Sequence, residues 1–464
     1  MGSTTRPDTS GFDALDDRLR GTLVRPEDDE YDTARRVWNG QIDRYPAAIA
    51  RCRGTADVMA AVNFAREQDL LMAVKSGGHD YAGNSVCDDG LVVDLSAMDG
   101  VRVDPDRATA YVEPGARWAD LYHETRAFDL ALPGGGGIVG VAGFTLGGGI
   151  SYLSRKYGLA CDHLVGADVV TASGELVHAS EDENPDLFWA LRGGSGNFGI
   201  VTGFEFDLDR IGPTVLAGRV LQPVDDAKRV LQFYRTFMAD APDELGTWVI
   251  VSRVPSDPAI PATYHGEPAV SLALCYDGDI DAGREVVAPL RAFGDPILDD
   301  VRRQSYTGFK LGSDDRYESI DRWYSKSQYL ETLPDEAIDV MVEHTRTLPD
   351  SQTMIGLSRL GGAIGRVDST EMAFPHRNAA YEFDIWAAWS DPTRDEELME
   401  WARAFHEAMA PYSTGGVYVN MLSHDEQDRV RAAYGTNYER LADLKAKFDP
   451  ENLFSMNQNI EPTD

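Results

Sequence analysis

Cysteine is scarce in this chain. Only four occur among 464 residues, at Cys52, Cys87, Cys161 and Cys275, and none forms a Cys-x-x-Cys pair. A zinc site or a disulfide framework needs closer and more regular spacing, so the sequence argues against both. We expect these four side chains to be small buried apolar groups.

Long hydrophobic runs are also missing. No apolar stretch approaches the roughly 18 residues that a membrane-spanning helix needs, so we expect no membrane partner. The first residues, Met1 to Asp8, are polar and lack the apolar segment of an export signal. Arg6 breaks the myristoylation pattern. We therefore predict a cytoplasmic protein.

Basic residues are few beside the acidic ones. Lys and Arg number 43 against 77 Asp and Glu, which gives a net charge of −34. This charge repels nucleic-acid phosphates, so we expect no nucleic-acid partner. The hydrophobic fraction of 43% is ordinary, and the acidic residues are spread along the chain. We take this pattern as the acidic surface of a halophilic protein, with the hypothesis that its stability needs concentrated salt.

Two standard phosphate-binding motifs are absent. The sequence has no G-x-x-x-x-G-K-[ST], and no G-x-G-x-x-G stands between a strand and a helix with an acid about 20 residues later. Glycines instead gather at residues 77–78, 134–149 and 193–199. Glycine lets a backbone approach a ligand closely and present its N–H groups to it. Three such clusters indicate one long ligand of the size of FAD, while tight turns against a core remain the alternative.

The order of the expected elements divides the chain into parts. Before Ile211-Gly212-Pro213-Thr214, short strands alternate with glycine turns, and after it strands alternate with longer helices. Because a chain of 464 residues exceeds the usual size of one core, two or more domains are expected. The predicted parts are a flexible N-terminus (1–30), a first domain (31–212), a second domain (213–425) and a C-terminal segment (426–464).

Hydrophobic periodicity locates the main elements. We expect strands at residues 70–74, 91–95, 109–113, 167–172, 175–178, 200–206, 248–252, 270–275, 323–328 and 381–389. We expect helices at residues 55–65, 118–128, 186–191, 224–238, 282–293, 334–346 and 393–409. The pattern of the second domain predicts an antiparallel sheet with helices on one face.

Several segments together resemble a known family. They follow one another in the order typical of FAD-linked oxidases of the berberine bridge enzyme type, within the vanillyl alcohol oxidase superfamily. The matching segments are residues 75–85 (KSGGHDYAGNS), 139–143 (VGVAG) with 147–149 (GGG), 155–162 (RKYGLACD), 186–194 (DLFWALRGG), 418–420 (YVN), 434–438 (YGTNY), 448–454 (FDPENLF) and 457–460 (NQNI).

This resemblance implies a fold and a cofactor. The fold is α+β with two domains: a PCMH-type FAD-binding domain, completed by the C-terminal segment, and an inserted substrate-binding domain. His79 is implied to bind the 8α carbon of FAD through its imidazole, since a neutral imidazole is a competent nucleophile. Many relatives carry a second tether, a cysteine, where this chain has Gly136. We therefore expect one covalent bond, as in bacterial 6-hydroxy-D-nicotine oxidase-like members, and no metal.

The resemblance also implies which residues surround FAD. They are Lys75, Ser76, Gly77, Gly78, His79, Asp80, Gly83, Asn84, Pro133, Gly134, Gly136, Gly137, Val139, Gly140, Gly143, Thr145, Gly147, Gly148, Gly149, Tyr157, Asp162, Gly199, Ile200, Val201, Tyr418, Asn420 and Asn457. At the position of Val139 a small residue leaves space for O₂ beside the flavin in this family. This favours an oxidase over a dehydrogenase.

The implied reaction is a two-electron oxidation of a small molecule. A hydride passes from a C–H next to an O–H or N–H to FAD, and O₂ is reduced to H₂O₂. Candidate substrates are a sugar or polyol, an aromatic alcohol and a cyclic amine. A dehydrogenase with another electron acceptor and a flavin-binding protein without turnover remain alternatives, and the oligomeric state stays open.

A base must remove the O–H or N–H proton. We favour Tyr418, which shares a face with Asn420 if this segment is extended. A phenol needs a lowered pKa to act at neutral pH. Lys326 and Tyr324 are further catalytic candidates on one face of a predicted strand. Glu382, Asp384 and Trp386 share a face of another strand, and each set points either to the flavin or away from it.

Overall fold

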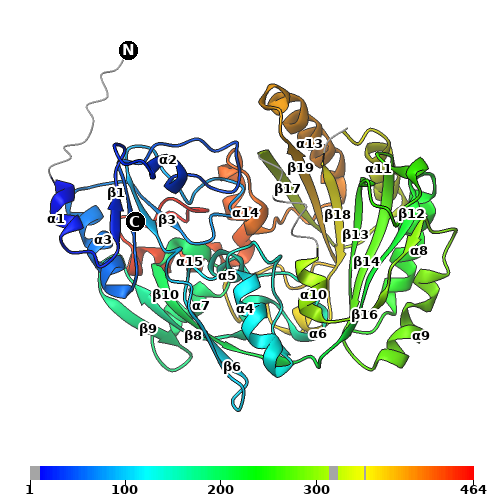
Figure 1. Cartoon of the computed structure of the whole chain (residues 1–464), viewed down its shortest axis with the longest axis horizontal. Coiled ribbons are helices and arrows are strands. Elements are labelled where there is room, and N and C mark those ends of the chain that lie inside the picture. Colours follow the sequence, from blue (N-terminus) through cyan, green and yellow to red (C-terminus); the bar gives the residue numbers. More distant parts are fainter. Residues whose placement is uncertain (1–10, 313–321, 350–351, 464) are drawn as a thin grey trace.

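A computed structural model describes residues 11–312, 322–349 and 352–463 of the protein. Two halves stand side by side in Figure 1. The N-terminal part, in blue and cyan, forms one half together with the red C-terminal segment, and the residues between them form the other around one large sheet. This mixed helix and sheet arrangement confirms the predicted α+β class.

Two small sheets lie in the first half. In the order β1-β2-β4-β3, the strands β2, β4 and β3 are parallel and β1 runs antiparallel to β2. The second sheet is antiparallel with the order β5-β6-β10-β8-β9. The strands are β1 (Thr22–Val24), β2 (Ala48–Arg51), β3 (Met72–Lys75), β4 (Leu91–Asp94), β5 (Val101–Asp104), β6 (Thr109–Val112), β8 (Leu164–Val170), β9 (Leu176–Ser180) and β10 (Ile200–Asp207), with β7 (Leu130–Ala131) pairing separately with β11 (Asp209–Arg210).

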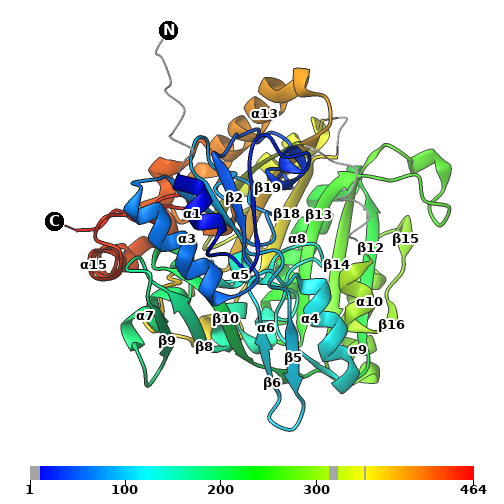
Figure 2. The same cartoon turned by 60° about the vertical axis from the view of Figure 1, so that its left-hand side comes forward.

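Short helices connect and cover these sheets, as Figure 2 shows for α1 and α3. In α3 the residues Val58, Ala61, Val62 and Ala65 recur at helical spacing and are all fully buried, which gives the helix one apolar face. The helices of this half are α1 (Phe12–Asp16), α2 (Tyr31–Ala34), α3 (Thr55–Glu67), α4 (Trp118–Thr125), α5 (Val141–Leu146), α6 (Ser154–Tyr157) and α7 (Pro185–Leu191).

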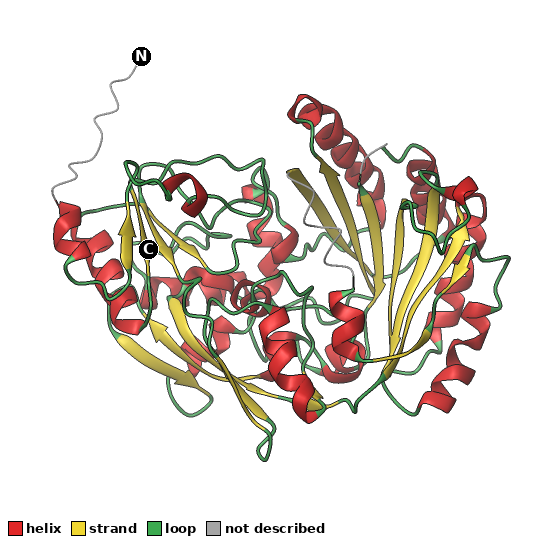
Figure 3. Ribbon diagram, in the orientation of Figure 1, coloured by secondary structure: helices red, strands yellow, loops and turns green. Residues whose placement is uncertain are grey.

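One eight-stranded antiparallel sheet forms the second half, in the order β15-β12-β14-β13-β18-β19-β17, with β16 pairing β12. Helices pack against the side of this sheet that faces away from the first half (Figure 3). The strands are β12 (Val215–Pro223), β13 (Leu245–Arg253), β14 (Pro268–Tyr276), β15 (Leu298–Asp299), β16 (Arg302–Gln304), β17 (Arg322–Leu330), β18 (Met354–Arg359) and β19 (Tyr381–Trp389). The helices are α8 (Ala227–Ala239), α9 (Ile280–Arg291), α10 (Tyr306–Leu311), α11 (Asp335–Arg346), α12 (Ala363–Arg366) and α13 (Asp395–Met409).

Alternation along β19 divides its side chains between two environments. Phe383 and Ile385 lie in the core between the sheet and its helices. Glu382, Asp384 and Trp386 therefore point to the opposite face, toward the first half. The register across the neighbouring strands extends this division to the whole sheet.

The C-terminal segment packs on the first half through α14 (Val430–Tyr434) and α15 (Tyr438–Phe448). Lys445 and Asp449 form a fully buried ion pair of 2.7 Å. The Lys445 ammonium also donates to the carbonyls of Asn197, at 2.9 Å, and Phe454, at 3.0 Å. Because every charge of this pair is hydrogen-bonded, the turn after α15 is held firmly against the glycine loop before β10.

The longer elements largely agree with the sequence prediction. Every expected strand and helix is present, with ends shifted by a few residues. Among the longer strands the sequence missed β12 and β18, in which Gly218 and Gly356 interrupt the apolar pattern. It also missed the short strands β1, β2, β5, β7, β11, β15 and β16. All four cysteines are buried and unpaired, as expected.

The predicted flexible N-terminus is wrong for the part of it that the structure describes. Residues 1–10 lie outside the described residues. Within residues 11–30, Phe12 and Leu15 of α1 are buried, and β1 adds a strand to the first sheet. Apolar residues hidden between acidic ones thus anchor this part of the chain. Every helix among the described residues falls short of the length and apolarity needed to cross a bilayer.

Candidate active site

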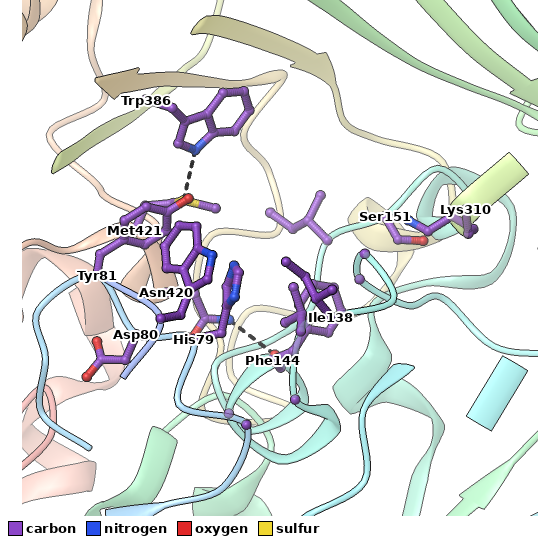
Figure 4. Close-up of a pocket in the computed structure, with 18 of the residues that line it drawn as sticks. His79, Asp80, Tyr81, Ile138, Phe144, Ser151, Lys310, Trp386, Asn420 and Met421 are labelled. Carbon is purple, nitrogen blue, oxygen red and sulfur yellow. Dashed lines mark hydrogen bonds between the residues drawn. The ribbon is translucent and has the colours of Figure 1, made fainter. Parts of the chain in front are cut away.

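A cavity of about 930 Å³ lies between the two halves. The first half contributes the glycine loops that follow β3 and β7, and the second half contributes one face of its sheet together with α10. In Figure 4, His79 and Asn420 stand near its centre, Trp386 above them, and Ser151 and Lys310 at its far end. The cavity is therefore elongated, with the glycine loops at one end and α10 at the other.

The loop after β3 touches the second glycine loop without any side chain between them. A Cβ on Gly77 would meet the Cα of Gly140 at 2.6 Å, which is too close for any residue other than glycine. The N–H groups of Gly77, Gly78 and His79 donate no hydrogen bond to another part of the described chain. Successive free N–H groups of this kind form an anion-binding nest.

The second glycine loop turns its carbonyl groups away from the cavity. The carbonyl of Gly135 accepts from the Tyr122 hydroxyl at 2.8 Å, and that of Val139 accepts from the N–H of Trp118 at 3.0 Å. In a trans peptide the C=O and the following N–H point in opposite directions. The N–H groups of Gly136 and Gly140 therefore point into the cavity, which both residues line.

His79 stands beside this nest as a half-buried side chain. Its ring stacks on the indole of Trp38, with 3.8 Å between ring centroids and 27° between planes. Burial, together with the charge of Arg117, lowers the pKa of His79 to about 3. The imidazole is consequently neutral at any physiological pH.

Asp80 lines the cavity, but its carboxylate is engaged by its own loop. Its carboxylate accepts the N–H of Ala82 at 2.9 Å and that of Asn84, so it closes the turn of its own loop. In Figure 4 it points away from the other labelled side chains. Its role is to shape the loop that carries His79.

Two asparagines of the C-terminal segment reach the cavity. Asn420 donates through its amide to the carbonyl of Phe144 at 3.1 Å and to the hydroxyl of Tyr418 at 2.9 Å. Asn457 donates to the carbonyl of Phe454 at 2.8 Å, and its own amide oxygen is buried without a partner among the described residues. A buried oxygen without a donor is the mark of an absent ligand or water.

About half of the predicted cofactor residues line the cavity. Those that do are Ser76, Gly77, Gly78, His79, Asp80, Asn84, Gly136, Val139, Gly140, Gly143, Gly199, Ile200, Val201, Asn420 and Asn457. Those that lie behind its walls are Lys75, Gly83, Pro133, Gly134, Gly137, Thr145, Gly147, Gly148, Gly149, Tyr157, Asp162 and Tyr418.

The residues behind the walls hold the loops in place. Lys75 donates to the carbonyls of Ala34, at 2.8 Å, and Arg36, at 2.9 Å. The hydroxyl of Tyr157 donates to Asp277 at 2.6 Å. Asp162 accepts two hydrogen bonds from the buried Arg377, at 2.6 and 2.8 Å. These bonds support the segments that line the cavity, and the contact of these residues with the cofactor stays a prediction.

Sequence reasoning missed several residues of the cavity wall. Among them are Trp38, Tyr81, Ile138, Phe144, Ser151 and Tyr152. Ile138 and Phe144 stand inside the glycine-rich stretch, where apolar residues between glycines were a usable signal. Trp38 comes from a segment before the first glycine loop and carries no local pattern that would place it here.

The predicted geometry of Tyr418 is wrong. Val419–Met421 form a 3₁₀ turn instead of an extended strand, so Tyr418 and Asn420 do not share a strand face. The phenol oxygen accepts from the N–H groups of Gly149, at 3.0 Å, and Ile150, at 3.4 Å. Burial raises the pKa of Tyr418, and the nearby Glu382 raises it further. A protonated phenol cannot serve as a base at neutral pH.

Tyr324 and Lys326 lie on the wrong face of β17 for the role predicted for them. The hydroxyl of Tyr324 donates to Asp425 at 2.8 Å, and the ammonium of Lys326 pairs with Glu426 at 3.1 Å. Tyr324 belongs to the core beneath the helices, and neither side chain lines the cavity. Strand alternation was predicted correctly, but only the register decides which face meets the cavity.

Glu382 and Asp384 occupy the face that does meet it. Both are only 1% exposed, and the Asp384 oxygens and one Glu382 oxygen have no hydrogen-bond partner among the described residues. Burial raises the pKa of Asp384 to about 8. Burial and the charge of Asp384 raise the pKa of Glu382 well above its usual range. The pair therefore holds at least one proton at neutral pH, one step along β19 from Trp386, which lines the cavity.

The far part of the cavity has an aromatic wall. Tyr152 meets Trp248 edge to face at a centroid distance of 4.9 Å, and meets Phe309 in the same way at 5.0 Å. The ammonium of Lys310 lies 5.5 Å from the centre of the Tyr152 ring. Arrangements of this kind suit a flat apolar ring.

Comparison with known proteins gives this cavity its context. A family model described as an FAD binding domain matches residues 46–180, and one described as berberine and berberine like matches residues 417–461. An FAD-linked oxidoreductase of Dictyostelium discoideum is 30% identical over 449 residues, covering 96% of this chain and 95% of that protein. The chain belongs to the FAD-linked oxidoreductases of the berberine bridge enzyme type. It is thus an enzyme of the vanillyl alcohol oxidase superfamily.

Other members of this family resemble the chain over nearly its whole length. The (R)-6-hydroxynicotine oxidase of Paenarthrobacter nicotinovorans is 30% identical over 465 residues, covering 96% of this chain and 97% of that protein. The xylooligosaccharide oxidase of Thermothelomyces thermophilus is 31% identical over 484 residues, covering 97% and 95%. The crystal structure of 6-hydroxy-D-nicotine oxidase from Arthrobacter nicotinovorans superposes with a TM-score of 0.85 at 28% identity, covering 96% and 98%.

The residues around the cavity fit the FAD of this family. The N–H groups of the two glycine loops suit its pyrophosphate. The contact between Gly77 and Gly140 leaves no side chain in the way of a flat ring. The free oxygen of Asn457 and the neutral imidazole of His79 offer a hydrogen-bond acceptor and a nucleophile. FAD is therefore the cofactor that these walls hold.

Proposed function

We propose that this protein is an oxidase with one covalent bond to FAD, formed by His79. It removes a hydride from a C–H next to an O–H or N–H of a small molecule, and O₂ is then reduced to H₂O₂. The observation that carries the proposal is a neutral imidazole at the edge of a nest of main-chain N–H groups, in a cavity that continues to the aromatic wall. FAD supplies the redox chemistry, and the chain supplies binding, orientation and proton transfer.

A single tether follows from the second glycine loop. Gly136 stands where many relatives have a cysteine, and no cysteine of the chain lines the cavity. Val139, half-buried in the wall, leaves the space beside the ring that we associate with reaction with O₂. We infer that oxygen, and not a protein or quinone, is the electron acceptor.

We propose that the Glu382–Asp384 pair, and not Tyr418, accepts the O–H or N–H proton of the substrate. Asp384, whose pKa burial raises to about 8, can release or take up a proton close to neutral pH, and its charge raises the pKa of the buried Glu382 beside it. Tyr418, whose pKa is raised, stays protonated and acts by holding Asn420 in position through a 2.9 Å hydrogen bond. The pair lies on the cavity face of the sheet, whereas Tyr324 and Lys326 do not.

The walls favour a flat substrate. Trp248, Tyr152 and Phe309 present ring edges and faces, and Trp386 closes the end near Asn420. Rings of this kind gain from stacking and from burial of an apolar body. An aromatic alcohol or a cyclic amine therefore matches the cavity better than a polyol, whose many hydroxyl groups need polar partners.

Anaerobic mixing with a set of candidate substrates tests the function. We expect an aromatic alcohol or cyclic amine to bleach the flavin absorbance, and admission of air to restore it with one H₂O₂ formed per substrate oxidised. Reduction without reoxidation by air would instead indicate a dehydrogenase. A flavin that no compound class reduces would contradict catalysis altogether.

A further inference from the structure

Trp38 lies between the two halves of the molecule, sandwiched by two rings. One face of its indole stacks on His79 at 3.8 Å, and the other stacks on Trp323 of β17 at 4.7 Å, with 28° between the planes. The ring of Tyr81 meets Trp38 edge on at 5.5 Å. The indole of Trp38 thus covers one face of the imidazole. The imidazole also lines the cavity.

Hydrogen bonds to both halves fix the segment that carries the indole, while the indole N–H itself has no partner among the described residues. The main-chain N–H of Trp38 donates to the carbonyl of Gly78 at 2.9 Å. The side chain of Asn39, which is fully buried, pairs with the main chain of Trp323 through two bonds of 2.9 and 3.0 Å, as a neighbouring strand would. The position of Trp38 is therefore set before any cofactor arrives.

The surroundings of His79 contain no acid that would hold a proton on its ring. Arg117 is the charged group that acts on it, and Arg117 disfavours the imidazolium. The neighbouring Asp80 is engaged by the N–H groups of its own loop. Trp38, Trp323 and Tyr81 are neutral. Water is kept from the covered face of the imidazole chiefly by the indole.

We propose that Trp38 is a positioning residue for the covalent attachment of FAD: its indole fixes the plane of the His79 ring and shields that ring from water, so that a neutral nitrogen faces the 8-methyl carbon. This inference rests on the tether proposed above. It adds a second residue, remote in sequence from the glycine motif, to the attachment reaction.

The reaction balances with O₂ as the oxidant. The His79 nitrogen gives its lone pair to the 8-methyl carbon, so that an N–C bond forms. One C–H bond of the methyl group and the N–H bond of the imidazole break, and both protons are released to water. The two electrons left on the ring system pass to O₂, which takes up two protons and becomes H₂O₂. Trp38 exchanges neither protons nor electrons in this sequence.

The test follows attachment instead of turnover. Full-length protein is produced in riboflavin-limited cells, incubated with FAD, and precipitated with acid at timed intervals. The flavin that stays with the precipitate measures the covalent bond, and fluorescence quenching of FAD before acid measures non-covalent binding. The variants are Trp38→Ala, Trp38→Leu and Trp38→Phe. Trp401→Phe, on α13 and outside the cavity lining, is the matched control.

We expect Trp38→Ala to bind FAD within about threefold of the wild-type affinity but to attach it at least about 10-fold more slowly. Trp38→Phe keeps a stacking plane and should attach FAD at close to the wild-type rate, as should Trp401→Phe. Trp38→Leu keeps an apolar cover without a plane and should fall between Ala and Phe. If Trp38→Ala does not fold, the attachment rate of Trp38→Leu tests the role of Trp38 in its place.

The pH profile separates positioning from a general loss of structure. With water at the ring, the pKa of His79 should return toward its ordinary value of about 6.5. Only about one tenth of the imidazole is neutral at pH 5.5 in that case, so Trp38→Ala should attach FAD about 10-fold more slowly at pH 5.5 than at pH 8. The wild type, with a pKa of about 3, should show no such difference.

Two results would overturn the inference in distinguishable ways. Equal rates and equally flat pH profiles for the wild type and both Trp38→Ala and Trp38→Leu would reject the role of Trp38 while leaving the tether intact. A wild-type precipitate that is colourless, although FAD binds before acid is added, would reject the tether and the inference together.

Discussion

The two halves of this enzyme meet their ligands by different means. The first half presents main-chain N–H groups, and the approach of Gly77 to Gly140 leaves no space for a Cβ. The second half presents side chains from one face of a sheet, such as Trp248 and Trp386. A local glycine motif is enough to predict recognition by the main chain. Recognition by side chains depends on the register between strands that are distant in the sequence.

The contrast is sharpest between two neighbouring strands. On β17, Tyr324 and Lys326 point to the helices, while on β19 Glu382 and Asp384 lie on the opposite face, buried beside Trp386, which lines the cavity. Acidic side chains buried without partners cost free energy, so their persistence argues for a role in function. A protein with 77 acidic residues places these two where no solvent reaches them.

The largest expected effect tests which face is functional. Asp384→Asn should slow flavin reduction by roughly 10²- to 10⁴-fold, because it removes the carboxyl group to which we assign the proton transfer. The wild-type rate should rise with pH through an apparent pKa near 8, the value to which burial raises Asp384, and this rise should disappear in the variant. Stopped-flow absorbance under nitrogen measures both.

Tyr324→Phe is the matched control, one strand away on the opposite face. We expect it to change the rate by less than about threefold. If Asp384→Asn and Tyr324→Phe reduce the flavin at equal rates, Asp384 is not the group that accepts the substrate's proton.

A smaller effect tests the main-chain half. Gly77→Ala places a Cβ 2.6 Å from the Cα of Gly140, and backbone cannot yield as a flexible side chain can. We expect a loss of about 1–3 kcal/mol in the free energy of unfolding and a loss of most bound flavin. Urea unfolding and the ratio of flavin to protein absorbance measure these. Gly54→Ala, where a Cβ meets nothing within 4 Å, is the control, and equal flavin content in the two would contradict close packing of the loops.

Salt should raise the thermal stability of both halves, whereas each single substitution acts on one of them. The net charge is −34, so the acidic side chains repel one another, and dissolved ions screen this repulsion. We expect the melting temperature to rise by at least about 5 °C between 0.1 and 2 M KCl. An unchanged midpoint would reject the hypothesis of a protein adapted to salt.

A further expected effect concerns stability and pH. The pKa of Asp384 is about 8 in the folded protein, above its ordinary value of about 3.9 in an unfolded chain. The folded state therefore keeps a proton that the unfolded chain releases, and the stabilisation this gives is lost as pH rises through 8. Asp384→Asn cannot titrate, so its melting temperature relative to the wild type should be higher at pH 9 than at pH 5.

Asp425 offers the opposite sign for comparison. Its pKa is lowered, because Lys326, Arg403 and Tyr324 outweigh its burial. Asp425→Asn should therefore lower the melting temperature at pH 7 to 9, with the difference shrinking as the solution is acidified below pH 4. The same sign for both variants would contradict the environments described for the two faces.

The sequence predicted what local patterns can encode. Residues 75–85 placed His79 at the end of a buried strand, and the resemblance named the family and its FAD. The alternation expected along a strand also placed Glu382 with Asp384 on one face, and Tyr324 with Lys326 on one face.

Long-range packing accounts for the failures. The choice between the two faces depends on pairing of β17, β18 and β19, which no local pattern states. Val419–Met421 turns where an extended strand was predicted, because the Tyr418 oxygen accepts the N–H groups of Gly149 and Ile150. Trp38 lies 41 residues before His79 in the chain and meets it through packing within the first half, while Trp323 of the second half stacks on Trp38 as well.

Mass spectrometry of the tryptic peptide that begins at Ser76 tests the central claim most directly. If a neutral His79 binds the cofactor as proposed, this peptide carries the mass of FAD, fragments with the adduct on His79, and loses it in His79→Ala. A peptide of unmodified mass from protein that is yellow before digestion would contradict the account.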